Sequence, residues 1–225
     1  MTGSEGDFNA HSYWDERHKA YSDDLRDVGN KRISSEQNEK QLVNKAVHLA
    51  FLLGELGFRP SATLLDAGCW MLDAGCGKGF ITEILSGAGF QCVGVDVSEC
   101  AIDLTPKESS VEYFASSLEA FKCNHRFDIV LCADVLYHLV DDSGWAEAVC
   151  NLLQHLEKDG ALIIVEAFIK DGRSAPHVKW RTLNDYECLA RELSATCRVL
   201  DIHEEQYSKD CKTFLELRRS SPEVA

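Results

Sequence analysis

The segment LLDAGCWMLDAGCGKGF (residues 64–80) contains the same five residues twice, because LDAGC occupies positions 65–69 and again positions 72–76. A short apolar run that ends in Asp-x-Gly is typical of a strand that leaves a parallel sheet toward a nucleotide. One such strand is sufficient for one nucleotide. One copy is therefore expected to form the site, and the other must be placed elsewhere.

The second copy has the features of a nucleoside site. Gly75, Gly77 and Gly79 let the backbone turn tightly and approach a ligand, and the predicted helix after them points free N–H groups toward it. Asp96 ends the next predicted strand, 23 residues after Asp73, close to the spacing of about 20 at which a carboxylate binds ribose hydroxyls. A purely structural glycine turn is the alternative. The G-x-G-x-G spacing departs from the dinucleotide fingerprint G-x-G-x-x-G, which argues against a nicotinamide-dependent dehydrogenase.

The first copy lacks these features, because Gly68 is followed by CWML, without further glycines or a helix start. Two copies seven residues apart cannot continue one strand with the same residues on the same face, since side chains alternate with a period of two. Asp66 would also lie in the sheet without a partner. We therefore predict that WMLDAG (residues 70–75) is the first strand and that the first copy is a loop at the amino end of the sheet, away from the ligand.

The bulk composition favours one α/β domain located in the cytoplasm. The 225 residues suffice for one such domain, and a net charge of −14 is unfavourable for binding a nucleic acid backbone. The polar N-terminus lacks the pattern of a signal peptide, and the longest apolar stretch contains His48 and Glu55 and is too short to cross a bilayer. We expect no nucleic acid and no membrane partner, and the oligomeric state is left open.

The ten cysteines are scattered and form no C-x-x-C pair. Free thiols inside apolar runs behave as small hydrophobic side chains, so we expect neither a disulfide framework nor a metal site.

Apolar runs alternate with helical patterns along the chain. This alternation predicts a mostly parallel sheet with helices on both faces, and the short polar link between the last two strands predicts an antiparallel hairpin at the end of the sheet. The predicted strands cover residues 70–75, 90–97, 111–115, 127–135, 161–168, 197–204 and 212–218. The predicted helices cover residues 12–21, 34–58, 80–88, 98–105, 117–121, 143–157 and 183–194, with Ser34 or Ser35 as the N-cap of the second and Gly57 at its end.

The motifs LDAGCGKGF, VGVDVSECAI, FDIVLCADVLYHL and LLQHLEKDGALIIVEAF, within residues 60–170, resemble class I S-adenosylmethionine-dependent methyltransferases. The resemblance implies a Rossmann-like, seven-stranded sheet whose last strand is antiparallel. It also implies that the glycine loop surrounds the methionine part of the cofactor and that Asp96 binds the ribose. Ser117 stands where the family usually has an adenine-binding Asp. The cofactor residues expected on this basis are Asp73, Gly75, Cys76, Gly77, Gly79, Asp96, Val97, Ser117, Leu118 and Ala133.

The flanking motifs YWDERH (residues 13–18) and HVKWR (residues 177–181) resemble a narrower group of stand-alone small-molecule methyltransferases. We expect residues 1–58 to form an N-terminal helical lid and residues 59–219 to form the cofactor-binding domain. The lid and the loop after the fifth strand are expected to build the acceptor pocket, with a packed aromatic helix and a surface loop as the respective alternatives. The candidate substrate residues are Tyr13, Trp14, Arg17, Tyr137, Trp180 and Arg181.

The candidate catalytic residues His138, His177 and Glu166 follow the fourth and fifth strands, because ligands of open α/β sheets bind at the carboxyl ends of strands. A hydroxyl acceptor needs a base, and His138 can serve as one, with Asp134 orienting it or a substrate group; simple packing and helix capping are the alternatives. We expect methyl transfer from S-adenosylmethionine to a small molecule, most readily a hydroxyl oxygen. A protein methyltransferase, or a non-catalytic member impaired by the duplicated segment, remains the alternative.

Deletion of residues 64–70 leaves PSATMLDAGCGKGF, an ordinary first strand of this family. We expect the shortened protein to bind S-adenosylmethionine as the full chain does and to have a higher free energy of unfolding, because a loop without a function is removed. Calorimetric titration and urea denaturation measure the two quantities. Loss of cofactor binding on deletion would show that the first copy belongs to the site.

Overall fold

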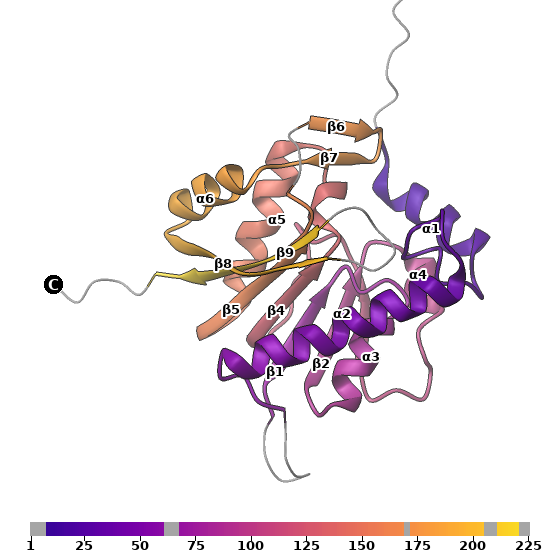
Figure 1. Cartoon of the computed structure of the whole chain (residues 1–225), viewed down its shortest axis with the longest axis horizontal. Coiled ribbons are helices and arrows are strands. Elements are labelled where there is room, and N and C mark those ends of the chain that lie inside the picture. Colours follow the sequence, from indigo (N-terminus) through magenta and orange to yellow (C-terminus); the bar gives the residue numbers. More distant parts are fainter. Residues whose placement is uncertain (1–7, 61–67, 169–171, 205–210, 221–225) are drawn as a thin grey trace, which may run out of the picture.

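The computed structural model describes residues 8–60, 68–168, 172–204 and 211–220. Within these ranges seven strands form one sheet in the order β3-β2-β1-β4-β5-β9-β8, in which β9 runs antiparallel to β5 and β8 and the other neighbouring pairs are parallel (Figure 1). These strands are β1 (Trp70–Ala74), β2 (Gln91–Asp96), β3 (Glu112–Ala115), β4 (Phe127–Ala133), β5 (Leu156–Glu166), β8 (Ala195–Glu204) and β9 (Cys211–Arg219). The predicted Rossmann-like sheet with an antiparallel last strand is confirmed.

Helices cover both faces of this sheet, as predicted. They are α1 (Ala10–Ala20), α2 (Ser35–Glu55), α3 (Phe80–Gly87), α4 (Glu99–Asp103), α5 (Asp142–Gln154) and α6 (Leu183–Glu192), with a short 3-10 helix, η1 (Leu136–His138). Alternate residues of β1 enter different cores: Leu72 packs with α5 and α6, whereas Met71 packs with α2 and α3. Among the described residues, none of the helices has both the length and the apolar character that a membrane span requires.

The strand that follows the first LDAGC copy is WMLDA, so the prediction that the first strand begins at Trp70 is confirmed. The predicted loop formed by the first copy falls largely on residues 61–67, outside the described residues. At the base of β1 the N–H of Cys69 donates to the carbonyl oxygen of Arg59 over 3.3 Å. Chain positions 59 and 69 therefore meet just before the strand begins.

Two local features differ from the sequence prediction. Residues 117–121 form a turn rather than a helix, because the side-chain amide of Asn151 on α5 donates to the carbonyl oxygens of Leu118 (2.7 Å) and Phe121 (2.9 Å). The predicted loop after β5 contains a small antiparallel hairpin, β6 (Gly172–Ala175) and β7 (Val178–Trp180). These strands are too short to show an alternating apolar pattern.

The long helix α2 begins at a capping box, in which the Ser34 hydroxyl accepts the N–H of Gln37 and the Gln37 side chain accepts the N–H of Ser34. Its residues Leu49 and Leu53 are buried against the sheet. Figure 1 shows α2 running across the strands on the near side. Because α2 shares a core with the sheet, the division of the chain at residue 58 stays a proposal.

The segment between α1 and α2 is fastened by one buried side chain. Asn38, on the first turn of α2, accepts the N–H of Asn30 (2.8 Å) and donates to the carbonyl oxygens of Asn30 (3.1 Å) and Ser34 (3.0 Å). Asn38 is 1% exposed, so its amide depends on these protein partners.

We expect Asn38→Ala to lower the free energy of unfolding by about 1–3 kcal/mol, because it removes three hydrogen bonds that hold residues 30 and 34 to α2. Asn44→Ala removes an exposed amide from the same helix and is the matched control, with an expected change within about 0.5 kcal/mol. Urea denaturation followed by circular dichroism measures both. Equal effects of the two substitutions would contradict the structural role of Asn38.

Candidate active site

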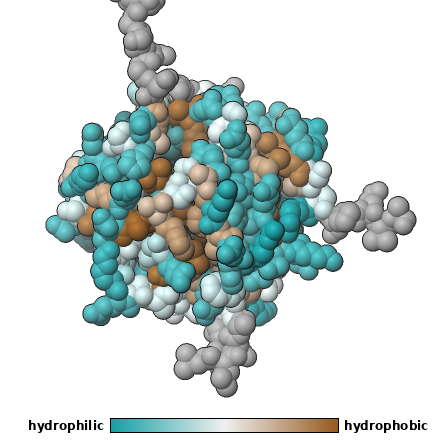
Figure 2. All heavy atoms as spheres, turned by 180° about the vertical axis from the view of Figure 1, so that it is seen from behind, coloured by the Kyte–Doolittle hydropathy of each residue, from teal (hydrophilic) through white to brown (hydrophobic). Residues whose placement is uncertain are grey.

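A cavity of about 580 Å³ lies at the carboxyl ends of β1, β2 and β4, under α1, the segment 21–33 and the start of α2. This position is where open α/β sheets bind ligands, and the volume suits a small-molecule site. Figure 2 shows the molecule from behind relative to Figure 1, and on this face hydrophilic side chains surround several apolar patches.

The glycine loop forms the floor of this cavity at the end of β1. Gly75 and Gly77 have positive φ angles of 88° and 54°. A Cβ on Gly75 would lie 2.3 Å from Val135 Cγ2, and one on Gly77 would lie 2.6 Å from Val28 Cγ1. Both conformation and packing therefore require glycine at these two positions.

Two buried carboxylates lie beside the loop. Asp73 accepts a 2.6 Å hydrogen bond from the Thr82 hydroxyl, and burial raises the pKa of Asp73 to about 6. Asp96 accepts the N–H groups of Gly77 and Ser98, each over 2.9 Å. Burial raises the pKa of Asp96, whereas these backbone N–H groups oppose the shift.

The structure places every predicted cofactor residue except Gly79 on the cavity wall. Gly79 lies just beyond it, as the N-cap of α3 with a φ angle of 80°. Residue Glu119 also lines the cavity, two positions after Ser117, and its Oε2 is buried without a hydrogen-bond partner among the described residues. Sequence reasoning missed Glu119, although it is the first acidic residue after β3.

Aromatic and imidazole rings form the opposite wall. Trp14 lies edge-on to His138 with ring centroids 4.7 Å apart, and Tyr137 contacts Trp180 at 4.6 Å. Trp14, Arg17, Tyr137, His138, His177 and Trp180 line the cavity. Tyr13 does not, and stacks instead on His177 at 4.6 Å.

His138 has a defined tautomer in this wall. Its Nδ1 lies 2.7 Å from the carbonyl oxygen of His177, and because a carbonyl oxygen can only accept, Nδ1 carries the proton. Its Nε2 is consequently an acceptor. Burial lowers the pKa of His138 to about 4, so the ring is neutral at ordinary pH. Burial lowers the pKa of His177 as well, and the charge of Arg17 adds to that effect.

Glu166 and Arg181, both expected at the pocket, do not line the cavity. Glu166 is 2% exposed and accepts hydrogen bonds from the Tyr186 hydroxyl (2.9 Å) and the Tyr137 N–H (3.1 Å). Burial raises its pKa to about 7. Arg181 donates to the carbonyl oxygen of Leu139 over 2.8 Å. Both side chains support the segment that carries Tyr137 and His138 rather than facing a ligand.

Asp134 lines the cavity as a charged anchor between two elements. It forms ion pairs with Lys45 of α2 and Lys212 of β9. Burial opposes ionisation of Asp134, but Lys212 and Lys45 outweigh burial and hold its pKa well below the usual range. Asp134 thus neither orients His138 through a hydrogen bond nor caps α5, whose N-cap is Asp141.

The N-terminal segment is bound directly to the glycine loop through Lys78, the residue between Gly77 and Gly79. The Lys78 ammonium donates to the carbonyl oxygens of Ser22 (2.9 Å) and Asp24 (3.3 Å). It also pairs with the buried carboxylate of Asp27, which lies 2.9 Å from His18 Nδ1. The loop and its cover therefore form one structure.

A further contact fixes α1 over the end of β2. The Ser98 hydroxyl, 2.5 Å away, and the Cys100 N–H, 3.2 Å away, both donate to Asp15. Together with the Lys78 contacts, this places α1 over the carboxyl ends of the strands.

Comparison with known proteins agrees with this geometry. A family model described as "Methyltransferase domain" matches residues 71–160. The ubiquinone biosynthesis O-methyltransferase of Rickettsia canadensis is 32% identical over 99 residues, which cover 42% of this chain and 41% of that protein. The chain thus spans less than half of the length of the first curated relatives that it matches.

Two solved structures share the fold across nearly the whole chain. Magnesium protoporphyrin IX methyltransferase from Synechocystis PCC 6803, with bound S-adenosylhomocysteine, superimposes with a TM-score of 0.68 at 17% identity, covering 93% of this chain and 98% of that chain. The 1,6-didemethyltoxoflavin-N1-methyltransferase of Burkholderia thailandensis gives a TM-score of 0.67 at 20% identity, covering 95% and 92%.

The fold, the position of the glycine loop and the matched segment agree: residues 71–160 match a methyltransferase domain, and the chain has the fold of methyltransferases that were solved with bound S-adenosylhomocysteine.

Proposed function

We propose that the protein transfers the methyl group of S-adenosylmethionine to a small-molecule acceptor by in-line displacement, with a hydroxyl oxygen as the accepting atom. The observation that carries the proposal is a single cavity with Asp96 and the glycine loop at its floor and the neutral imidazole of His138 among the aromatic rings of its wall.

The floor of the cavity fits the cofactor residue by residue. Gly75 and Gly77 leave no room for side chains, so their backbone can approach the methionine part. Asp96 uses one lone pair of each oxygen for a backbone N–H and has others for ribose hydroxyls. The unpartnered Oε2 of Glu119 can accept the adenine amino group, a role for which the sequence offered only Ser117.

The cofactor supplies an already activated methyl group, so the protein has to align the acceptor and exclude water. The cover formed by α1 and the segment 21–33 supports an acceptor small enough to be enclosed with the cofactor. The ring wall built by Trp14, Tyr137 and Trp180 favours a flat or aromatic acceptor.

His138 is the proposed general base. Its Nε2 accepts the hydroxyl proton as the bond between oxygen and methyl forms, and the His177 carbonyl oxygen keeps Nδ1 protonated. A base with a pKa of about 4 is weak, but the hydroxyl becomes strongly acidic as the methyl group is transferred. Near neutral pH, Nε2 is also unprotonated and can accept the proton.

The similar proteins include enzymes for both oxygen and nitrogen acceptors: the curated relative from Rickettsia canadensis is an O-methyltransferase, and the solved structure from Burkholderia thailandensis is an N1-methyltransferase. The hydroxyl acceptor is favoured here because His138 lines the cavity and its Nε2 is unprotonated. A neutral amine acceptor would have less need of a base.

The cofactor assignment is tested with Asp96→Asn and Glu119→Gln. We expect each to weaken S-adenosylhomocysteine binding about tenfold or more, because a carboxylate that accepts ligand hydrogen bonds is lost. Asp103→Asn, which changes an exposed carboxylate on the next helix, is the control and is expected to bind normally. Calorimetric titration provides the affinities. Unchanged binding by Asp96→Asn would refute the ribose role.

The base assignment is tested with His138→Gln, which can still donate to the His177 carbonyl but cannot take up a proton. Labelled S-adenosylmethionine offered with a library of phenols, alcohols and amines first identifies an acceptor. We then expect kcat to fall about 100-fold or more in the variant, with S-adenosylhomocysteine affinity retained. His155→Gln is the control, because His155 also donates to a backbone carbonyl but lies outside the cavity.

The pH dependence follows from the lowered pKa of His138. The ring is neutral above its pKa of about 4, so titration of His138 should not change wild-type activity near neutral pH, and activity should fall as pH decreases toward 4. NMR titration of the imidazole checks the same pKa without turnover. A His138 ring that becomes protonated near pH 6.5 would be incompatible with this burial.

A further inference from the structure

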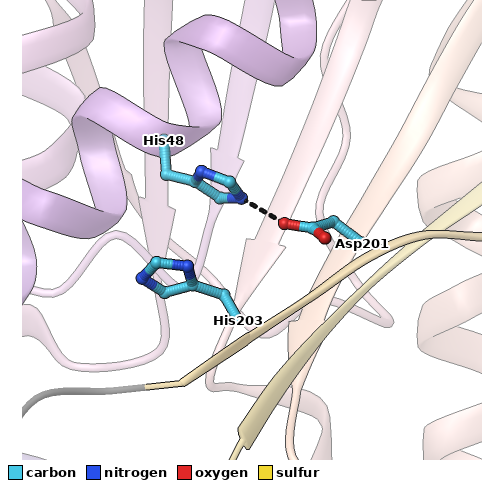
Figure 3. A group of neighbouring side chains, drawn as sticks. All are labelled: His48, Asp201 and His203. Atoms are coloured by element: carbon cyan, nitrogen blue, oxygen red, sulfur yellow. Dashed lines mark hydrogen bonds and ion pairs between the residues drawn. The ribbon is translucent and has the colours of Figure 1, made fainter.

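Three potential metal ligands meet outside the active-site cavity. His48 lies on α2, whereas Asp201 and His203 lie on the edge strand β8. His48 Nε2 is 2.7 Å from Asp201 Oδ2, and one ligand atom from each of the three residues lies within 4.8 Å of the others. Figure 3 shows His48 reaching from its helix toward Asp201, with the ring of His203 beside it.

The backbone explains why these side chains meet. Asp201 and His203 are two residues apart on a strand, so they project from the same face of the sheet. That face is the one covered by α2. The His48 ring is held by Phe214 of β9, with centroids 5.0 Å apart, and stacks on the His203 ring at 4.7 Å.

We propose that His48, Asp201 and His203 bind one divalent transition-metal ion of the zinc class. Two imidazole nitrogens and one carboxylate oxygen are a common ligand set for such ions, which leaves further positions for water. Two ligands at about 2.1 Å from one ion lie at most about 4.2 Å apart, so ligand atoms within 4.8 Å need to move only by tenths of an ångström.

A hydrogen-bonded His48–Asp201 pair alone does not account for His203. Within the described part of the chain, the ring nitrogens of His203 have no hydrogen-bond partner, yet the ring is placed directly against His48. All three side chains are partly exposed, so an ion can enter from solvent and the site can retain water ligands.

The charges around the site are compatible with a cation. Lys45 lies one turn before His48, and Lys212 is paired with His203 in the β8–β9 register, but both ammonium groups form ion pairs with Asp134. Glu204 follows His203 and lines the small neighbouring cavity with it. The net charge of −14 also attracts cations to the surface.

Bound metal would connect α2 to the β8–β9 hairpin. The same two elements supply Lys45 and Lys212, which hold Asp134 at the wall of the active-site cavity. The ion is therefore assigned a structural role: it restrains α2 against the hairpin and stabilises the folded state. This role does not depend on the identity of the acceptor or on methyl transfer.

The test uses the full chain without a histidine tag, after removal of metal with a chelator. Calorimetry with Zn²⁺ is expected to show one equivalent bound, and thermal unfolding is expected to shift to higher temperature on addition of Zn²⁺. Co²⁺ is expected to give visible ligand-field absorption without a thiolate charge-transfer band, because no cysteine belongs to the site. Failure to bind Zn²⁺ below millimolar concentrations would overturn the proposal.

His48→Gln, His203→Gln and Asp201→Asn are each expected to weaken Zn²⁺ binding about tenfold or more and to abolish the thermal shift. His11→Gln, which removes an exposed imidazole on α1, is the control and should behave as wild type. Using three ligand variants keeps the test valid if one fails to fold. A thiolate spectrum with Co²⁺ would assign the ion to the cysteines and refute the site. Undiminished Zn²⁺ binding in the folded variants would refute it as well.

Discussion

The hydrogen bonds from Gly77 and Ser98 to the buried carboxylate of Asp96 are the constraint on which the site depends. They join the loop after β1 to the end of β2, two strands that are neighbours in the sheet. Because Gly77 has a positive φ angle and contacts Val28, the loop can adopt this path only without side chains at the glycine positions. The glycine spacing, the acidic residue on β2 and the cover over the loop are therefore parts of one structural requirement.

The cover is connected to this loop by charge as well as by packing. Lys78 donates to backbone carbonyls of residues 22 and 24 and pairs with Asp27, while Asp15 accepts hydrogen bonds from Ser98 and Cys100. The segment before α2 is itself held by Asn38. The N-terminal segment consequently forms a wall of the cavity, and its aromatic residue Trp14 is brought against His138.

Burial sets the protonation states of the ionisable groups in and behind the cavity lining. The ionised forms of Asp73 and Glu166 are disfavoured by burial, which raises their pKa values to about 6 and 7, and the charged form of His138 is disfavoured in the same way. Asp134 is the exception, because Lys45 and Lys212 compensate its burial and keep it charged. The cavity therefore places the neutral imidazole of His138 and the ionised carboxylate of Asp134 near each other without a hydrogen bond between them.

The sequence by itself determined the sheet, its antiparallel last strand, the LDAGC copy that belongs to the first strand and the positions of Gly75, Gly77 and Asp96 at strand ends. These features follow from local patterns: apolar runs, glycine spacing and residues at strand ends. The tertiary structure alone decided that Glu166 and Arg181 lie behind the wall instead of lining the cavity, that Glu119 offers an unpartnered oxygen, and that residues 117–121 form a turn bound by Asn151. It also brought His48 beside Asp201 and His203. Such contacts join residues far apart in the chain, and which side chains meet depends on how helices pack on the sheet, which no local pattern records.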